Sequence, residues 1–377
     1  MCRKARLLSI ALVLSVSAAA HAADELTVEA IFGRRPLLAP LPTAVEWLGS
    51  SRGVTFVRRT DTDPPRSELV LREVPSGSER VILSADTVTV PADLQAGHPT
   101  FSIGSHQWDR AGKRAVFAFA GDVFMVDLDG KLMRVTDTDG SEKDPAFSPT
   151  GRRISFTRDN DLYTVDLGTH RYPETALTTT GCDTVLNGIL DWVYMEELFT
   201  RGDVRAHWWS PDGERLAFLE IREAPVPIYP IVDQLPVHPT TTLQRYPKAG
   251  DPNPIVRVGI VAAAGGPVVW ADVDTRDDSY IARVYWTGDG RAVAIEKLNR
   301  AQDRWTVLFA DATTGRTDVI MEETSPTWVN VSYVRHYYTS KRRFIMGSER
   351  DGHHHLYAFN MDGAPIRALT RGDWEVF

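Results

Sequence analysis

The sequence is poor in net positive charge, in cysteine and in long apolar runs. Beyond the N-terminal region, no stretch approaches the roughly 18 apolar residues that a membrane helix needs, which argues against a membrane span. The formal net charge of −8 at pH 7 disfavours binding to nucleic acid or anionic lipid. The chain has neither a Gly-Lys-Ser/Thr phosphate loop nor a dinucleotide fingerprint, so we expect no cofactor.

Residues 1–22 have the pattern of a secretory signal peptide. Three basic residues among the first six precede an apolar run at 7–19, and Ala-His-Ala at 20–22 suits signal peptidase. The alternative is an N-terminal membrane anchor, although the run is short for a bilayer. We therefore expect a secreted or periplasmic protein whose mature chain, residues 23–377, keeps only Cys182. With no internal disulfide, the mature chain must be stabilised by its core.

One turn signature recurs along the chain, and each copy leads into a short apolar segment. Its clearest form is Trp-Ser-Pro-Asp-Gly at 209–213. Proline presets the turn, Asp and Gly tolerate its unusual backbone angles, and the residues that follow suit a strand. The copies lie at residues 47–53, 108–112, 147–151, 209–213, 286–290 and 338–342.

Repetition of this unit predicts an all-β protein with a β-propeller fold. A β-sandwich is the alternative, but it would not repeat one turn signature six times. Gly112 and Gly151 are 39 residues apart (151 − 112), close to the ~40–45 residues of a blade. The next two spacings are 62 (213 − 151) and 77 residues (290 − 213). These longer spacings predict insertions, and inserted loops often carry function.

The first insertion predicts a short helix. Trp192, Met195 and Phe199 fall at i, i+3 and i+7, on one face of a two-turn helix. Glu196 and Glu197 then project from the other side. By sequence alone, such a pair of glutamates is typical of a solvated helix face.

The second insertion is rich in proline, at residues 224–230 and 245–254. Proline cannot donate a hydrogen bond within a central ladder. We therefore expect an extended arm at this point rather than a blade strand. A homodimer could form through such an arm.

The two insertions resemble segments of the dipeptidyl peptidase IV family, in the prolyl oligopeptidase clan. Asp-Trp-Val-Tyr-Met-Glu-Glu-Leu-Phe at 191–199 is similar to the double-glutamate segment of that family. Tyr-Pro-Lys-Ala-Gly-Asp-Pro-Asn-Pro at 246–254 is similar to the segment that follows it. Residues 348–352, 355–357 and 369–376 also match the later blades, and the resemblance covers roughly residues 40 to 377.

The resemblance implies that Glu196 and Glu197 bind the free N-terminal ammonium of a peptide. This chemistry is sound, because an α-amino group with a pKa near ~8 is mostly a cation at neutral pH. Two carboxylates offer it charge-assisted hydrogen bonds. The family also uses an arginine from an earlier blade to contact the substrate's carbonyl. Arg114 has a compatible spacing, but we interpret it as a turn residue.

The catalytic machinery of the family is missing from this sequence. A C-terminal α/β-hydrolase domain should supply a Gly-x-Ser-x-Gly elbow followed by Asp and His, and no such domain is present. Ser51 fits the elbow motif at residues 49–53, but a strand follows it where a helix is required, so we interpret it as structural. We therefore expect no catalytic residue here, and it is uncertain whether the chain is an enzyme.

The leading interpretation is the substrate-gating propeller of a longer serine peptidase that releases Xaa-Pro or Xaa-Ala dipeptides. The family's propeller has eight blades, so about six signatures predict an incomplete, truncated propeller that lacks its hydrolase domain. The alternative is a stand-alone periplasmic propeller that binds a protein partner. His353, His354 and His355 could suggest a metal, but we expect a solvated turn and no metal site there.

Overall fold

The computed structural model describes residues 27–28, 41–49, 51–60, 62, 66–169, 171–199, 204–331, 335–338 and 343–376. The expected signal peptide lies outside these residues. The chain divides into two compact units, Met1–Pro42 and Thr43–Phe377. The second unit contains all the strands that the described residues form. Within the described residues, no helix is long and apolar enough to cross a bilayer.

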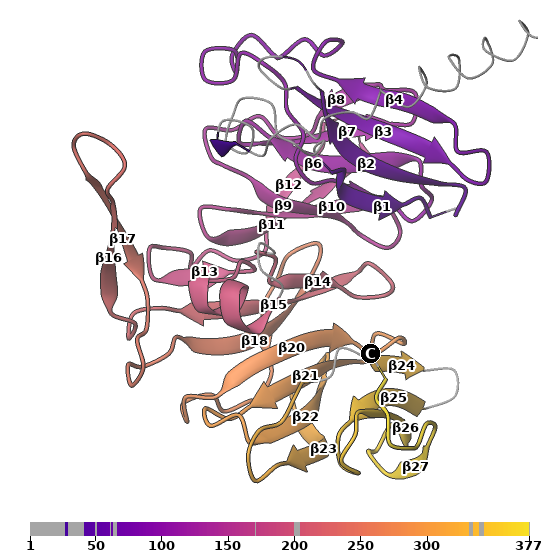
Figure 1. Ribbon diagram of the computed structural model, residues 1–377, viewed down its shortest axis with the longest axis vertical. Helices are drawn as coiled ribbons and strands as arrows, with labels where there is room; N and C mark the ends of the chain where they lie inside the picture. Colours follow the sequence, from indigo (N-terminus) through magenta and orange to yellow (C-terminus); the bar gives the residue numbers. More distant parts are fainter. Residues whose placement is uncertain are drawn as a thin grey trace, which may run out of the picture. The chain divides into compact units, whose positions relative to one another are not determined.

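Six antiparallel sheets follow one another along the chain, as the labels of Figure 1 show, and we number them blades 1 to 6. Five of them are simple four-stranded meanders. Blade 1 holds β1 (Thr43–Trp47), β2 (Gly53–Arg59), β3 (Ser67–Glu73) and β4 (Glu79–Ser84). Blade 2 holds β5 (Gln107–Trp108), β6 (Arg114–Phe119), β7 (Asp122–Asp127) and β8 (Leu132–Arg134). Blade 3 holds β9 (Lys143–Phe147), β10 (Arg153–Arg158), β11 (Asp161–Asp166) and β12 (Glu174–Ala176).

The later blades complete the set and carry both insertions. Blade 5 holds β20 (Tyr280–Trp286), β21 (Ala292–Leu298), β22 (Arg304–Asp311) and β23 (Thr317–Thr324). Blade 6 holds β24 (Arg335–Tyr338), β25 (Arg343–Ser348), β26 (His355–Asn360) and β27 (Pro365–Ala368). Blade 4 holds β14 (His207–Trp209), β15 (Arg215–Arg222), β18 (Ile255–Ala262) and β19 (Val269–Trp270), and β13 (Val185–Asn187) also pairs with β15. These sheets confirm the expected six blade units in the described residues.

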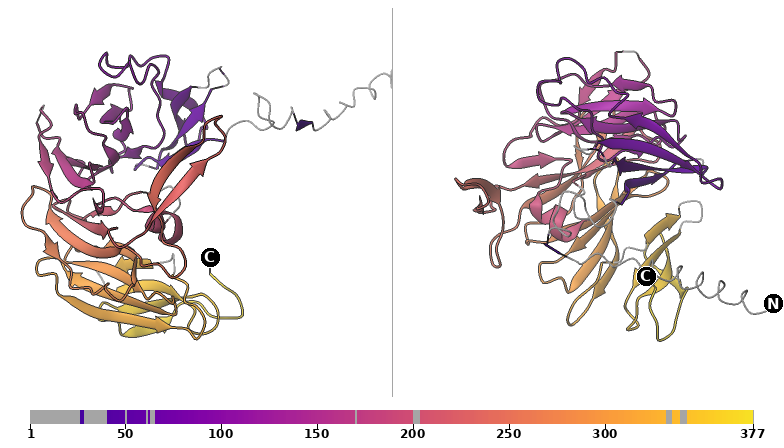
Figure 2. Two further views of the ribbon diagram at one scale, coloured as in Figure 1. Left: turned by 90° about the vertical axis from the view of Figure 1, so that its left-hand side faces the viewer. Right: turned by 45° about the horizontal axis from the view of Figure 1, so that its top comes forward.

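The proline-rich insertion forms a hairpin of its own. β16 (Ile228–Asp233) and β17 (Thr240–Arg245) pair only with each other among the described strands. The hairpin stands clear of the six sheets (Figures 1 and 2). Pro230 lies within it, where no central ladder has to be completed. The prediction of an extended arm is therefore confirmed.

The recurring turn signature joins the first and second strands of a blade. In each clear copy the glycine has a positive φ, between 63° at Gly112 and 73° at Gly213, which a residue without a Cβ adopts at no steric cost. The glycine N–H closes the turn, as Gly213 does on the Ser210 carbonyl at 2.9 Å. Of the two weaker copies, the one at residues 338–342 lies mostly outside the described residues, and the one at residues 47–53 lies between β1 and β2. Ser51 is followed there by a strand, which supports its structural interpretation.

Neighbouring blades share apolar cores in chain order. Every adjacent pair of blades contributes to a common buried cluster, so most strands are covered on both faces. This arrangement explains why their apolar residues form nearly continuous runs. Representative pairs are Leu69 with Phe117, Met125 with Phe156, Leu162 with Phe218, Leu219 with Ile295, and Trp305 with Phe344.

A His-x-Trp pair fastens two of these interfaces. The indole of Trp108 donates to the Thr55 hydroxyl of blade 1 at 2.7 Å, and the His106 ring contacts the same hydroxyl at 2.8 Å. In blade 4, Trp209 and His207 repeat these contacts on the Ser155 hydroxyl of blade 3, at 2.9 and 3.1 Å. Each hydroxyl therefore forms hydrogen bonds with the next blade along the chain.

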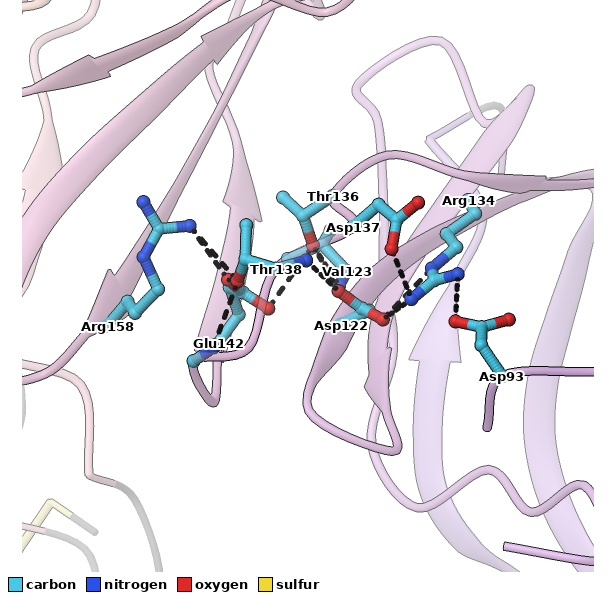
Figure 3. A network of polar contacts seen from close by, with 10 residues as sticks. Asp93, Asp122, Val123, Arg134, Thr136, Asp137, Thr138, Glu142 and Arg158 are labelled. Carbon is cyan, nitrogen blue, oxygen red and sulfur yellow. Dashed lines mark hydrogen bonds and ion pairs between the residues drawn. The ribbon is translucent and has the colours of Figure 1, made fainter. Parts of the chain in front are cut away.

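A second repeat closes the ends of the blades. In blade 2 the Thr136 hydroxyl accepts the Val123 N–H at 2.8 Å and donates to Asp122, the first residue of β7, at 3.2 Å. Thr178 contacts Leu162 and Asp161 in the same way in blade 3. Figure 3 shows that the blade 2 pair belongs to a longer network. That network runs from Asp93 through Arg134 to Asp122, and from Asp122 to Glu142 and Arg158 of blade 3. Thr136 and Thr138 each connect Asp122 to Glu142.

Candidate functional site

The predicted helix in the first insertion is present, and it is a π-helix, η1 (Tyr194–Leu198). The Asp191 carboxylate accepts the Tyr194 N–H at 3.0 Å and so satisfies a donor at the start of the helix. At its end, the Phe199 N–H donates to the Tyr194 carbonyl at 2.9 Å, a spacing of five residues. Such wide turns are rare and occur frequently at functional sites.

The apolar face of η1 packs on the core that blades 4 and 5 share. Trp192, Met195 and Phe199 all contact this cluster, as their spacing predicted. Tyr194 is buried, and its hydroxyl accepts the Ile281 N–H of β20 at 3.1 Å. This packing fixes the helix and turns the glutamates away from the core. Glu197 is exposed and Glu196 is half-buried.

An arginine of blade 5 holds the end of η1. Arg283 is buried, with 8% of its surface exposed. Its guanidinium donates to the carbonyl of Leu198, the last residue of η1, and lies 5.4 Å from the Phe199 ring centroid. A bond from a cation to a terminal helix carbonyl is favourable, because the partial negative charge of the helix gathers there. The glutamates are therefore positioned by blade 5 as well as by their own segment.

Glu197 stands between two cavities. The first has a volume of about 440 Å³ and lies among η1, blade 5 and blade 6. The second has a volume of about 460 Å³ and lies among η1, blade 5 and the segment after the arm. Four residues line both, so the two cavities adjoin: Glu197, Leu198, Gln302 and Trp328. Glu196 lines neither of them.

The second cavity joins the two insertion motifs. Tyr246, at the start of the proline-rich motif, packs its ring 4.4 Å from that of Trp192, next to η1. Lys248 of the same motif lines the cavity and lies 4.2 Å from the Tyr229 ring of the arm. Two segments that are about 50 residues apart in the sequence thus form one site.

Two further carboxyl groups lie near the base of η1. Burial raises the pKa of Asp191 to about 6, against the opposing effect of the backbone N–H groups that it accepts. Burial, and then the charge of Asp191, raise the pKa of Glu223 to about 7, while Arg245 opposes this shift. In both cases the folded protein binds the proton more tightly than the unfolded chain. Their contribution to stability therefore falls as the pH rises from about 4 to 7.

The structure places the other residues considered from the sequence outside the site. Arg114 bonds Asp109 of its own turn at 3.0 Å and the Gly151 carbonyl of the next blade at 2.6 Å, which agrees with its interpretation as a turn residue. The expectation of a solvated turn for the three histidines is wrong for His355. That residue is buried, and its ring contacts the Thr370 hydroxyl and the Gly372 carbonyl, at 3.1 and 2.9 Å. It occupies the position of Asp122 in the blade-end repeat.

Several residues of the site were missed by the sequence reasoning. Arg283, Gln302, Trp328, Asn330 and Glu349 line the first cavity. Glu349 begins the Glu-Arg-Asp-Gly stretch noted above as part of the resemblance, but that motif gave it no role. The signal that could have found Trp328 is its place between blades 5 and 6, since connections between blades often carry function.

The fold and the site together define a class of protein: a β-propeller with a two-glutamate helix inserted between β13 and β14 of blade 4, beside two adjoining cavities. The family model for the dipeptidyl peptidase IV N-terminal region matches residues 110–377. The chain belongs to this family, and it is the N-terminal propeller region of a dipeptidyl peptidase 4-like protein.

Individual relatives support this assignment. The chain is 30% identical to a probable dipeptidyl peptidase 4 of Aspergillus clavatus over 360 residues, which cover 91% of the chain and 45% of the relative. A probable dipeptidyl peptidase 4 of Aspergillus flavus is 29% identical over 362 residues, with 90% and 45% covered. The chain thus spans about half the length of these curated relatives.

Solved structures show the same fold. The crystal structure of Porphyromonas gingivalis dipeptidyl peptidase 4 superposes with a TM-score of 0.73 at 23% identity, over 89% of this chain and 47% of that one. A putative dipeptidyl aminopeptidase IV from Bacteroides ovatus gives a TM-score of 0.64 at 21% identity, over 91% and 48%.

Proposed function

We propose that this chain is the substrate-gating propeller of an exported serine dipeptidyl peptidase, in which Glu196 and Glu197 bind the free N-terminal ammonium of a peptide. The observation that carries the proposal is the exposed Glu197 carboxylate between two adjoining cavities. An ammonium in this position would receive charge-assisted hydrogen bonds. Export is proposed from the signal-peptide pattern of residues 1–22.

The cleavage reaction is assigned to a Ser-Asp-His domain of the longer protein. The propeller would hold the ammonium and so fix the distance from the peptide N-terminus to the scissile bond. Such a fixed distance would limit the products to dipeptides, which we propose to be Xaa-Pro or Xaa-Ala. The length of the curated relatives leaves room for this domain.

Glu197→Gln is expected to weaken peptide binding by about 10- to 100-fold, because a hydrogen bond to a charged group contributes ~1.5–3 kcal/mol. Calorimetry with a free-N-terminal tripeptide and its N-acetylated form measures the effect. The acetylated peptide should bind weakly to both proteins. Glu322→Gln is the matched control, because this exposed glutamate lies outside both cavities. Equal affinity for the free and acetylated peptides would refute the anchor role.

We further propose that the chain forms a homodimer through the arm. The β16–β17 hairpin exposes large apolar side chains, including Leu235 (95% exposed) and Leu243 (69%). Exposed apolar patches of this kind mark interaction surfaces, and a second copy of the hairpin would cover them. Leu235→Asp combined with Leu243→Asp should convert a dimer to a monomer in light scattering. A mass unchanged by both substitutions would argue against this contact.

A further inference from the structure

A chain of three side chains holds one carboxylate in the first cavity. The Trp328 indole N–H donates to the Asn330 Oδ1 at 3.0 Å, which fixes the orientation of the amide. The Asn330 Nδ2 then donates to both carboxylate oxygens of Glu349, at 2.8 and 3.0 Å. The amide orders the carboxylate but leaves its negative charge in place.

The charge of the first cavity is negative. Its lining holds three carboxylates, Glu197, Glu349 and Glu375, and one guanidinium, Arg283. With His354 counted as neutral, the formal charge is −2 (1 − 3). Arg283 is directed toward the Leu198 and Ala282 carbonyls, and its charge also acts on the buried Glu296.

An aromatic surface completes the cavity. Trp328 lines it and is 51% exposed, so its ring is accessible to a ligand. A cation over an indole ring is attracted by its negative π face. Leu198, Ala282, Leu298 and Val329 add an apolar wall that suits the methylene stem of a long cationic side chain.

The position of Glu197 connects this cavity to the peptide. Because Glu197 lines the cavity, the first side chain of a peptide whose ammonium binds there is within reach of it. The second cavity, which Glu197 also lines, carries Lys248 and Arg300 and suits a cationic side chain less well. We propose that the cavity selects peptides whose first residue is lysine or arginine, with Glu349 as the specificity-determining carboxylate. This inference rests on the proposed function, since it requires the ammonium to bind at Glu197.

The test compares tripeptides that differ only at the first residue. Calorimetry on the chain with Lys-Pro-Gly, norleucine-Pro-Gly and Glu-Pro-Gly separates charge from length, because norleucine keeps the four-carbon stem. An ion pair together with a cation–π contact should make the lysine peptide bind about 3- to 10-fold more tightly than the norleucine peptide. The glutamate peptide should bind the weakest.

Glu349→Gln should reduce the affinity for the lysine peptide more than the affinity for the norleucine peptide, and so reduce the advantage of lysine. Asn330→Ala should reduce the advantage of lysine in part, because it removes the hydrogen bonds that orient the Glu349 carboxylate but keeps its charge. Glu322→Gln on β23 removes the same charge outside the cavity and should retain the preference. If Glu349→Gln lowers the melting temperature too far for calorimetry, Glu375→Gln removes charge from the same cavity and supplies the measurement.

The outcomes separate this inference from the proposed function. Equal affinity for the lysine and norleucine peptides, with binding still dependent on Glu197, overturns the specificity and leaves the anchor in place. A lysine preference that survives both Glu349→Gln and Glu375→Gln also overturns it. Binding that ignores Glu197 and N-acetylation overturns the anchor, and the inference with it.

Discussion

Replacing Arg335 with methionine is expected to lower the free energy of unfolding by about 3–5 kcal/mol at pH 8, because it leaves a buried charge without its partner. The Arg335 Nε lies 2.7 Å from the Glu296 carboxylate, and the two side chains are 6% and 0% exposed. A second guanidinium nitrogen donates to the Tyr285 hydroxyl at 2.7 Å. The pair joins β21 of blade 5 to β24 of blade 6, so its loss also weakens the interface between these blades.

The loss should depend on pH in a defined direction. Burial raises the pKa of Glu296 to about 7, although Arg335 and Arg283 oppose the shift. Removing Arg335 raises this pKa further. Because the folded state then binds the proton more tightly than the unfolded chain, stability falls as the pH rises above about 4.5. The variant should therefore lose less stability at pH 5, where Glu296 can take up a proton, than at pH 8.

Urea unfolding of both proteins at pH 5 and pH 8 measures this difference. Arg316→Met is the matched control, since its exposed ion pair with Asp318 should contribute little at either pH. An equal loss at both pH values would show that Arg335 acts through packing rather than through the charge of Glu296.

Asp122→Asn is expected to lower the free energy of unfolding by about 1.5–3 kcal/mol, which is the contribution of a hydrogen bond to a charged group. Asp122 is 1% exposed and accepts from Arg134 at 2.9 and 2.5 Å and from Thr136 at 3.2 Å (Figure 3). The asparagine keeps an oxygen for Thr136 but loses the charge that pairs with Arg134. Asp122→Ala removes both and should cost more.

Asp93→Asn is the control for this network. Asp93 contacts the same guanidinium at 2.7 Å, but its side chain is 55% exposed. Its replacement should lower the free energy of unfolding, measured by urea denaturation, by less than about 1 kcal/mol. Similar decreases in the free energy of unfolding for the Asp122 and Asp93 variants would contradict the prediction that the buried carboxylate contributes more than the exposed one.

Local patterns predicted the elements of the fold. The Trp-Ser-Pro-Asp-Gly turn and its clear copies located the first hairpins of blades 2 to 5, because their chemistry is contained in five residues. The spacing of Trp192, Met195 and Phe199 located η1, and the prolines of the second insertion located the arm. Each of these predictions needed only residues close together in the chain.

Contacts between blades could not be predicted in this way. The Trp328–Asn330–Glu349 chain joins residues 2 and 19 positions apart in sequence, and Arg283 reaches Leu198 across 85 positions. His355 was expected in a solvated turn together with His353 and His354. Its burial depends on Thr370 and Gly372, which reach it only once β26 and β27 have paired.

The His-x-Trp contacts mean that the blades are not interchangeable modules. The Thr55 hydroxyl of blade 1 contacts blade 2, and the Ser155 hydroxyl of blade 3 contacts blade 4. Blades 1 and 3 are therefore each matched to the blade that follows. A rearranged chain in which blade 2 or blade 4 follows a blade other than 1 or 3 would leave its histidine and indole without these hydroxyl partners. The order of the blades is thus restricted by side-chain contacts between neighbouring blades as well as by the connecting segments.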